Sequence, residues 1–114
     1  RQSTDFYRVS DERIQKAVTF MRAHMGDEID INTVVRGVGI DRRSLERLFR
    51  SQLNMSPKAV LTEMRSTRAR ELLEQSDLRI GEIAERCGFG RSEKLASAFR
   101  QRFGKTPRAW RRAV

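Results

Sequence analysis

Two stretches of this 114-residue chain repeat one another, and this repeat limits the possible folds more than any other feature. Residues 29–57 align with residues 78–107, first at an offset of 49 positions and then, beyond a turn near Gly90-Arg91, at an offset of 50. In both copies a short apolar segment, a glycine and a longer amphipathic segment follow one another, which is the layout of a helix-turn-helix motif. The matched positions pair Ile31 with Ile80, Val34 with Ile83, Val38 with Cys87, Gly39 with Gly88, Leu45 with Leu95, Phe49 with Phe99, Leu53 with Phe103 and Pro57 with Pro107.

The apolar spacing is helical along almost the whole chain, and no window alternates as a half-buried strand does. A long helix is expected to open at Ser56-Pro57, because serine caps helices well and proline suits the first helical position. Its buried stripe is expected through Val60, Leu61, Met64, Leu72 and Leu73. The other expected helices cover 11–25, 31–37, 42–53, 80–87 and 92–103, and a last one opens at Thr106-Pro107.

The predicted fold is therefore all-α, with about seven helices. A first helix-turn-helix subdomain is expected over 10–56, a linker helix over 57–74 and a second subdomain over 75–114. Such a length suits one domain or two small subdomains.

Arginine supplies most of the charge of this chain. Of 24 basic residues 20 are arginines, and with 15 acidic residues the formal net charge is +9. Residues 1–56 contribute +2 and residues 57–114 contribute +7. The planar fork of arginine suits phosphates and guanine edges, so nucleic acid is the expected partner.

Several other classes of function are not expected. The apolar runs are only a few residues long, and the N-terminus shows neither an initiator methionine nor an apolar signal region, so neither membrane insertion nor secretion is predicted. The single cysteine, Cys87, forms no internal disulfide or multi-cysteine metal site and is expected in the core, like Val38. The single histidine, His24, is expected to be a helix-end cation, and no enzyme activity, metal or cofactor is predicted.

The second copy contains a characteristic set of residues, namely Ile83-Ala84-Glu85-Arg86-Cys87-Gly88-Phe89, the run from Ala98 to Pro107 and Trp110-Arg111-Arg112, and Leu45 to Arg50 and Ser56-Pro57 agree with it in the first copy. Through these residues the chain resembles the AraC/XylS family of transcription activators. The resemblance covers about residues 10–112. It implies a DNA-binding output domain, bacterial and cytoplasmic, that works with RNA polymerase and is joined to an effector-binding domain.

The first five residues, Arg1 to Asp5, resemble the segment that follows the periplasmic-binding-like sugar domain in the xylose-operon activators of that family. This resemblance implies that residues 1–9 are a linker from a separate N-terminal domain that binds a sugar effector. The genes controlled would then serve carbohydrate use, for example of xylose.

The exposed face of the predicted helix 42–53 is where base contacts are expected. Arginine can bind guanine with two hydrogen bonds, and Glu46 can accept from cytosine or orient a neighbouring arginine. The alternative is a solvated charged face with ion pairs within the helix. The resemblance assigns base contacts to Arg43, Glu46 and Arg47, with Arg42 nearby, and Arg50 is expected on a phosphate.

The corresponding face of 92–103 lacks the arginine cluster. The offset of 50 places Ser92, Glu93, Ala96 and Ser97 at the base-contacting positions. Serine offers one short hydroxyl, and Ala96 could touch a thymine methyl group. The second copy therefore either reads bases weakly or reads only shape and backbone, through Arg91, Lys94 and Arg100.

Helix starts and nearby cations are expected to hold the DNA backbone. These phosphate candidates are Arg50, Ser56, Lys58, Arg91, Lys94, Arg100, Lys105, Thr106 and Arg108, with Arg111 and Arg112 as further cations. Ordinary helix capping and a solvated terminus are the alternative.

The sequence as a whole predicts sequence-specific binding of double-stranded DNA, with two recognition helices in successive major grooves about 34 Å apart. A nonspecific basic nucleic-acid-binding module is the alternative, and it would carry cations on all its faces. A second rival is the DNA-binding part of a repair methyltransferase, which needs a cysteine cluster that Cys87 alone does not supply.

Overall fold

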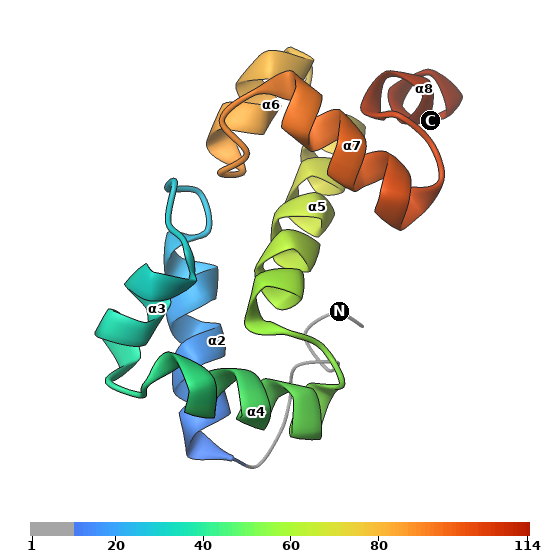
Figure 1. The fold of residues 1–114 in the computed structure, drawn as a ribbon. Coiled ribbons are helices and arrows are strands. Elements are labelled where there is room, and N and C mark those ends of the chain that lie inside the picture. The colour runs from blue at the N-terminus through green and yellow to red at the C-terminus, as the bar shows by residue number, and fades with distance from the viewer. Residues whose placement is uncertain (1–10) are drawn as a thin grey trace. The chain divides into compact units, whose positions relative to one another are not determined.

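The chain is all-helical in the computed structural model, which describes residues 11–114 (Figure 1). The all-α prediction is thereby confirmed, and both recognition helices begin and end at the predicted residues. The described residues form seven helices and no strand: α2 (Glu12–His24), α3 (Ile31–Val38), α4 (Arg42–Leu53), α5 (Pro57–Gln75), α6 (Ile80–Arg86), α7 (Ser92–Phe103) and α8 (Pro107–Ala113). The predicted linker at 1–9 lies outside the described residues.

The described chain divides into two compact units. Residues 11–24 and 29–61 form the first unit, which contains α2, α3, α4 and the start of α5. The short segment Met25–Glu28 and Thr62–Val114 form the second unit, which contains most of α5 together with α6, α7 and α8. None of the helices of residues 11–114 combines the length and the apolar character that crossing a bilayer requires.

In the first unit, α2, α3 and α4 pack against one another. Helix α3 begins at Asp30, whose carboxylate accepts a hydrogen bond of 3.0 Å from the Thr33 backbone N–H. Gly37 brings α3 close to α2, since a Cβ there would lie 2.3 Å from the Phe20 ring. The buried apolar residues of α2, α3 and α4 are Ile14, Ala17, Val18, Met21, Ile31, Val34, Leu45, Phe49 and Leu53.

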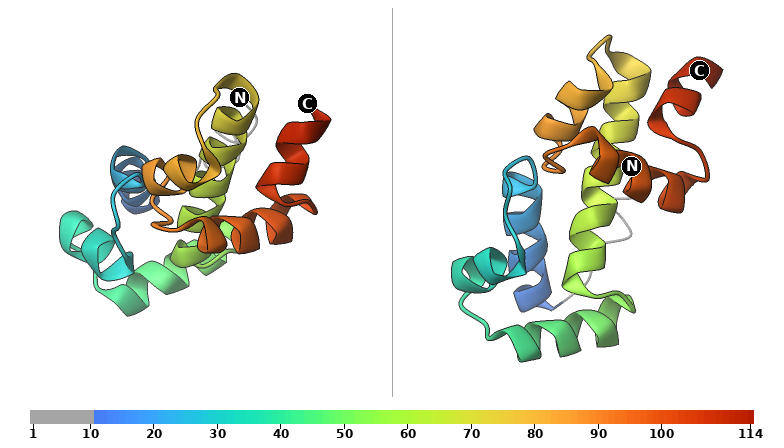
Figure 2. Two further views of the ribbon diagram at one scale, coloured as in Figure 1. Left: turned by 90° about the horizontal axis from the view of Figure 1, so that it is seen from above. Right: turned by 45° about the horizontal axis from the view of Figure 1, so that its top comes forward.

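In the second unit, α6 packs on α7 and α7 on α8 (Figure 2). The buried core consists of Ala69, Leu73, Ile83, Ala84, Cys87, Leu95 and Phe99. Phe89, Phe103 and Trp110 pack against this cluster and are partly buried. The Trp110 indole N–H keeps a hydrogen bond of 3.0 Å to Glu74 at the rim.

The single buried stripe predicted for 57–74 is wrong in one respect. Val60, Leu61, Met64 and Leu73 are buried, but Leu72 is only half-buried. At about 100° per residue, Val60 and Met64 lie on one face of α5, whereas Ala69 and Leu73 lie on the opposite face. Leu72 packs against the core of the second unit and remains half-buried.

Two further apolar residues, Met25 and Leu48, are only half-buried. Helix α2 ends at His24, and Met25 lies in the following turn. Leu48 is half-buried on α4, where it borders the buried positions Leu45 and Phe49.

The segment Met25–Glu28 is held within the second unit by Arg65. The guanidinium donates hydrogen bonds of 2.9 Å to the carbonyls of Met25 and Asp27. Gly88, in the turn between α6 and α7, has a φ of +87°, and a Cβ there would lie 2.0 Å from the Met25 carbonyl oxygen. The turn of the second helix-turn-helix therefore requires glycine at this position for both backbone geometry and space.

Candidate nucleic-acid interface

Helix α4 presents its charged face to solvent because its apolar residues are used in the core. Leu45, Phe49 and Leu53 are buried, which leaves the opposite face exposed. The helix starts at Asp41, whose carboxylate accepts a hydrogen bond of 3.0 Å from the Ser44 N–H. Hydrogen bonding from the Ser44 side chain, then from its backbone, lowers the pKa of Asp41.

Three arginines of this face have guanidinium groups without a hydrogen-bond partner within residues 11–114. Arg43, Arg47 and Arg50 are exposed, and their side chains form no hydrogen bond or close ion pair there, although Arg47 is attracted electrostatically to Asp41. Uncommitted guanidinium groups keep all five N–H donors available for a ligand. The solvated-face alternative predicted ion pairs within the helix, and these three arginines form none in this part of the chain.

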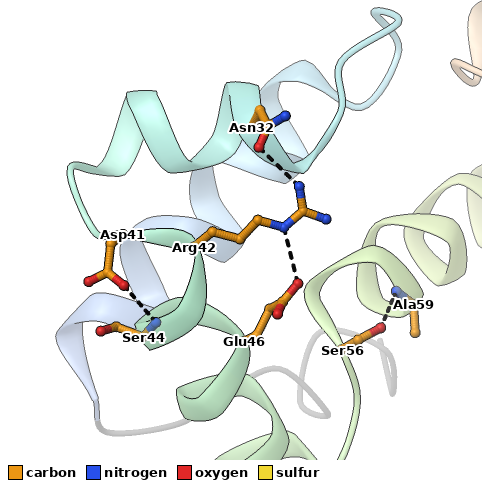
Figure 3. Close-up of polar contacts among 7 residues, drawn as sticks. All are labelled: Asn32, Asp41, Arg42, Ser44, Glu46, Ser56 and Ala59. Carbon is orange, nitrogen blue, oxygen red and sulfur yellow. Dashed lines mark hydrogen bonds and ion pairs between the residues drawn. The ribbon is translucent and has the colours of Figure 1, made fainter.

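Arg42 differs from the other three because the protein already engages it (Figure 3). Its Nε donates to the Glu46 carboxylate at 3.1 Å, and a terminal nitrogen donates to the Asn32 side-chain oxygen at 3.0 Å. Arg42 therefore orients Glu46 and ties α4 to α3. Sequence reasoning allowed the contact with Glu46 but missed Asn32, because the partner lies on another helix.

The corresponding face of α7 forms a shallow hollow. Ala96, Ser97, Arg100, Gln101 and Thr106 line a space of about 680 Å³. The short side chains of Ala96 and Ser97 keep this space open, and Arg100 and Gln101 place polar groups beside it. Gln101 was not among the predicted site residues, although its amide could bind an adenine edge or a phosphate.

The two recognition helices also start differently. Asp41 caps α4 with its side chain, whereas α7 starts after Arg91 with no side-chain cap. Ser92, at the first position of α7, is half-buried, while Glu93 and Ser97 are exposed. Ser92 is therefore less accessible than the other predicted base-contacting residues at exposed positions of α7.

The predicted phosphate ligands fall into two groups. The side chains of Ser56 and Thr106 each accept a hydrogen bond of 3.1 Å, from Ala59 N–H and Ala109 N–H respectively, so both residues cap helices. The others are exposed cations: Arg50, Lys58, Arg91, Lys94, Arg100, Lys105 and Arg108. Arg112 is exposed as well.

Arg111, expected as a cation beside the DNA, also has a structural role. Its guanidinium donates to four backbone carbonyls, those of Leu72, Leu73, Ser76 and Leu78, at 2.6 to 3.4 Å. These carbonyls lie at the end of α5 and in the following loop, where the helix leaves acceptors unpaired. The sequence did not reveal this role, because it does not show which carbonyls a guanidinium will meet.

Two more arginines of the second unit bind other groups of the protein. Arg102 forms a two-bond ion pair with Glu63, and Arg65 holds the segment Met25–Glu28. The net positive charge of residues 57–114 therefore overstates the number of cations available to DNA.

Cys87 has the character of a core residue, as predicted. Its side chain is fully buried, and burial raises the pKa of the thiol to about 11. Among the residues that the structure describes, no group of three or more histidine, cysteine or acidic side chains is placed to hold a metal ion.

Two helix pairs, each with a charged or polar second helix facing solvent, define the class of a helix-turn-helix DNA-binding protein. A model of the helix-turn-helix domain matches residues 34–113. The DNA-binding domain of AdpA, solved with a target DNA, superposes with a TM-score of 0.83 and 34% identity over 91% of this chain and 93% of that one. An AraC-type regulator from Chromobacterium violaceum gives a TM-score of 0.81 and 35% identity over 89% and 90%.

Curated regulators match in sequence as well. The transcriptional regulator GbdR of Pseudomonas aeruginosa is 36% identical over 84% of this chain, and the xylose operon regulatory protein of Escherichia coli K12 is 30% identical over 97%. The chain spans only 26% and 28% of these two relatives. This chain belongs to the AraC-type helix-turn-helix family, and the predicted resemblance is confirmed.

Proposed function

We propose that this chain binds double-stranded DNA by sequence, as the output domain of a transcription activator. The observation that carries the proposal is the exposed face of α4. Three uncommitted arginines and an oriented glutamate lie there together, on the second helix of a helix-turn-helix pair. Such a helix enters the major groove, where arginine and glutamate distinguish base edges.

In the first unit, Arg43 and Arg47 are the proposed guanine ligands and Glu46 the cytosine ligand. Arg42 is proposed to act mainly by positioning Glu46, since two of its donors are engaged by Glu46 and Asn32. Arg50, one turn further along α4, and Lys58 and Ser56 at the start of α5 are the proposed phosphate ligands.

In the second unit, base contacts through Ser92, Glu93, Ala96 and Ser97 are proposed to be weaker. The hollow beside Ala96 and Ser97 has room for a thymine methyl group but offers few hydrogen bonds. Positioning on the backbone is proposed for the cations around it, namely Arg91, Lys94, Arg100, Lys105 and Arg108, together with Thr106.

A sugar effector and RNA polymerase are proposed as further partners of the whole protein. The xylose operon regulatory proteins of Haemophilus influenzae and Escherichia coli match 97% of this chain. A solved xylose-binding transcription activator superposes on 99% of it with a TM-score of 0.83 and 29% identity. By analogy with these relatives, we propose that the whole protein controls genes of carbohydrate use.

Selection of bound duplexes from a random library tests the proposal. We expect one enriched motif with a G·C-rich half, and Arg47→Ala should flatten that half without unfolding the domain. Arg22→Ala, at an exposed cation on α2, is the matched control. Recovery of no motif, with equal affinity for all duplexes, would instead support the nonspecific basic module.

A further inference from the structure

We infer that the second unit holds one DNA-backbone phosphate in a hollow between α6, α7 and α8, through Arg79 and Arg108. This hollow has a volume of about 510 Å³ and is distinct from the one beside Ser97. The side chains that matter for its chemistry are Asp77, Arg79, Ser92, Arg108 and Arg111. The inference rests on the proposed DNA binding and adds a ligand site to it.

Arg79 and Arg108 are the two cations of the hollow whose guanidinium groups are available to bind a ligand. Both are exposed, and neither guanidinium group forms a hydrogen bond or ion pair within residues 11–114. Two like charges at the rim of one concave site repel one another, so a bound anion relieves an unfavourable interaction as well as making new ones. Phosphate suits this pair, because each guanidinium can donate two parallel hydrogen bonds to it.

Arg111 supplies a fixed positive charge to the same hollow. Its donors are directed at four backbone carbonyls, so it cannot swing out to follow a ligand. A carbonyl-bound guanidinium still keeps its charge, since arginine is not deprotonated in proteins. Arg111 is therefore an electrostatic contributor to the hollow and not a ligand that closes on the phosphate.

The position of Ser92 in this hollow makes it a candidate phosphate ligand and no longer a candidate base contact. The repeat places it opposite Arg42 as a candidate base contact, yet it lines the hollow with Arg79 and Arg108. Its hydroxyl has no hydrogen bond within the described residues and can donate to a phosphate oxygen. Asp77 is the one carboxylate of the hollow, and it opposes anion binding there.

A phosphate-neutralisation scan tests the inference. Each phosphate of the selected duplex is replaced in turn by an uncharged methylphosphonate, and affinity is measured for the wild-type protein and for an Arg79→Ala/Arg108→Ala double variant. One position should weaken the wild-type complex but have no further effect on the double variant. The double variant should also reduce the salt slope by about one unit, because one phosphate contact is lost, and its base preference should stay unchanged.

Arg86→Ala is the matched control, because Arg86 is an exposed arginine of α6 that already pairs with Glu82. Asp77→Asn should act in the opposite direction and strengthen binding. If the double variant keeps the same salt slope and the same sensitive phosphates as Arg86→Ala, the inference is overturned. The proposed function would stand in that case, provided that Arg47→Ala still relaxes base preference.

Inorganic phosphate separates a DNA-backbone site from a site for free anions. At constant ionic strength it should neither bind measurably by calorimetry nor compete with DNA, because one phosphate without the rest of the duplex gains too few contacts. Saturable binding of inorganic phosphate that Arg79→Ala abolishes would overturn the assignment to the DNA backbone.

Discussion

The arginine residues of this chain fall into two groups. Some guanidinium groups donate hydrogen bonds to backbone carbonyls, and others are exposed and form no such bonds. Arg111 meets four carbonyls and Arg65 meets two, and both side chains are half-buried. Arg43, Arg47 and Arg50 meet none within residues 11–114 and are exposed. The same residue type therefore supplies stability in one place and ligand-binding capacity in another.

Arg111→Ala should lower the free energy of unfolding by about 1.5–3 kcal/mol, because it leaves carbonyls at the end of α5 without their donor. Urea unfolding followed by circular dichroism measures this loss. Arg112→Ala removes the neighbouring exposed arginine and should change stability by less than about 0.5 kcal/mol. Equal effects of the two substitutions would show that the four hydrogen bonds contribute nothing.

At the scale of elements, helix boundaries could be predicted because their signals are local. Asp41 marks the start of α4, and Asn54, with a φ of 57°, marks its end. The repeat adds a second copy of the same signals, so α7 could be placed as well. Burial could be predicted less completely, because α5 buries different faces along its length and the apolar spacing does not show where the face changes.

The candidate site could be predicted only where helix faces determine it. The exposed face of α4 followed from the positions of its apolar residues. Asn32 was missed because its hydrogen bond to Arg42 joins two helices. Gln101 was missed because the offset pairs it with Ser51, for which no DNA contact is expected.

The two buried faces of α5 can be tested with neighbouring leucines. Leu73→Ala should cost about 2–5 kcal/mol of stability, because Leu73 is 3% exposed and its loss leaves a cavity in the second core. Leu72→Ala should cost clearly less, since surrounding water already reaches that side chain. Equal losses in urea unfolding would place both leucines on one buried stripe and contradict the change of face.

Two carboxylates that cap helices make the stability of the fold depend on pH. Hydrogen bonding from Thr33 lowers the pKa of Asp30, and hydrogen bonding from Ser44 lowers that of Asp41. Each lowered pKa means that the carboxylate stabilises the fold at neutral pH and that this stabilisation is lost as pH falls below about 4. Asparagine caps helices as well as aspartate does, but it does not titrate.

An Asp30→Asn/Asp41→Asn double variant should therefore lose less stability than the wild type between pH 7 and pH 3. Thermal unfolding at the two pH values measures the difference. Asp77→Asn is the control, because it removes an exposed carboxylate that caps no helix. This variant should lose as much stability between pH 7 and pH 3 as the wild type does. A double variant with the full sensitivity would show that other groups cause the acid response.

At the scale of the whole molecule, the two recognition helices differ in their means of binding DNA. Helix α4 carries uncommitted arginines and an oriented glutamate, whereas α7 presents short side chains around a hollow with cations beside it. If both copies contact one DNA site, the first should supply most of the base discrimination. The second should supply mainly backbone affinity, which falls steeply with salt.

This asymmetry predicts three distinct responses at one selected site. Arg47→Ala should cost about 1–3 kcal/mol of binding and relax preference at one base pair, because a two-bond guanine contact is lost. Ser97→Ala should cost clearly less and leave base preference unchanged, since one rotatable hydroxyl discriminates little. Arg100→Ala should weaken all sequences alike and reduce the salt slope by about one unit, as expected for a phosphate ligand. The measurement is binding of each variant to the selected duplex and to its single-base variants at two salt concentrations. A change of base preference in Ser97→Ala as large as that in Arg47→Ala would make the second copy a full reader of sequence and refute the asymmetric model.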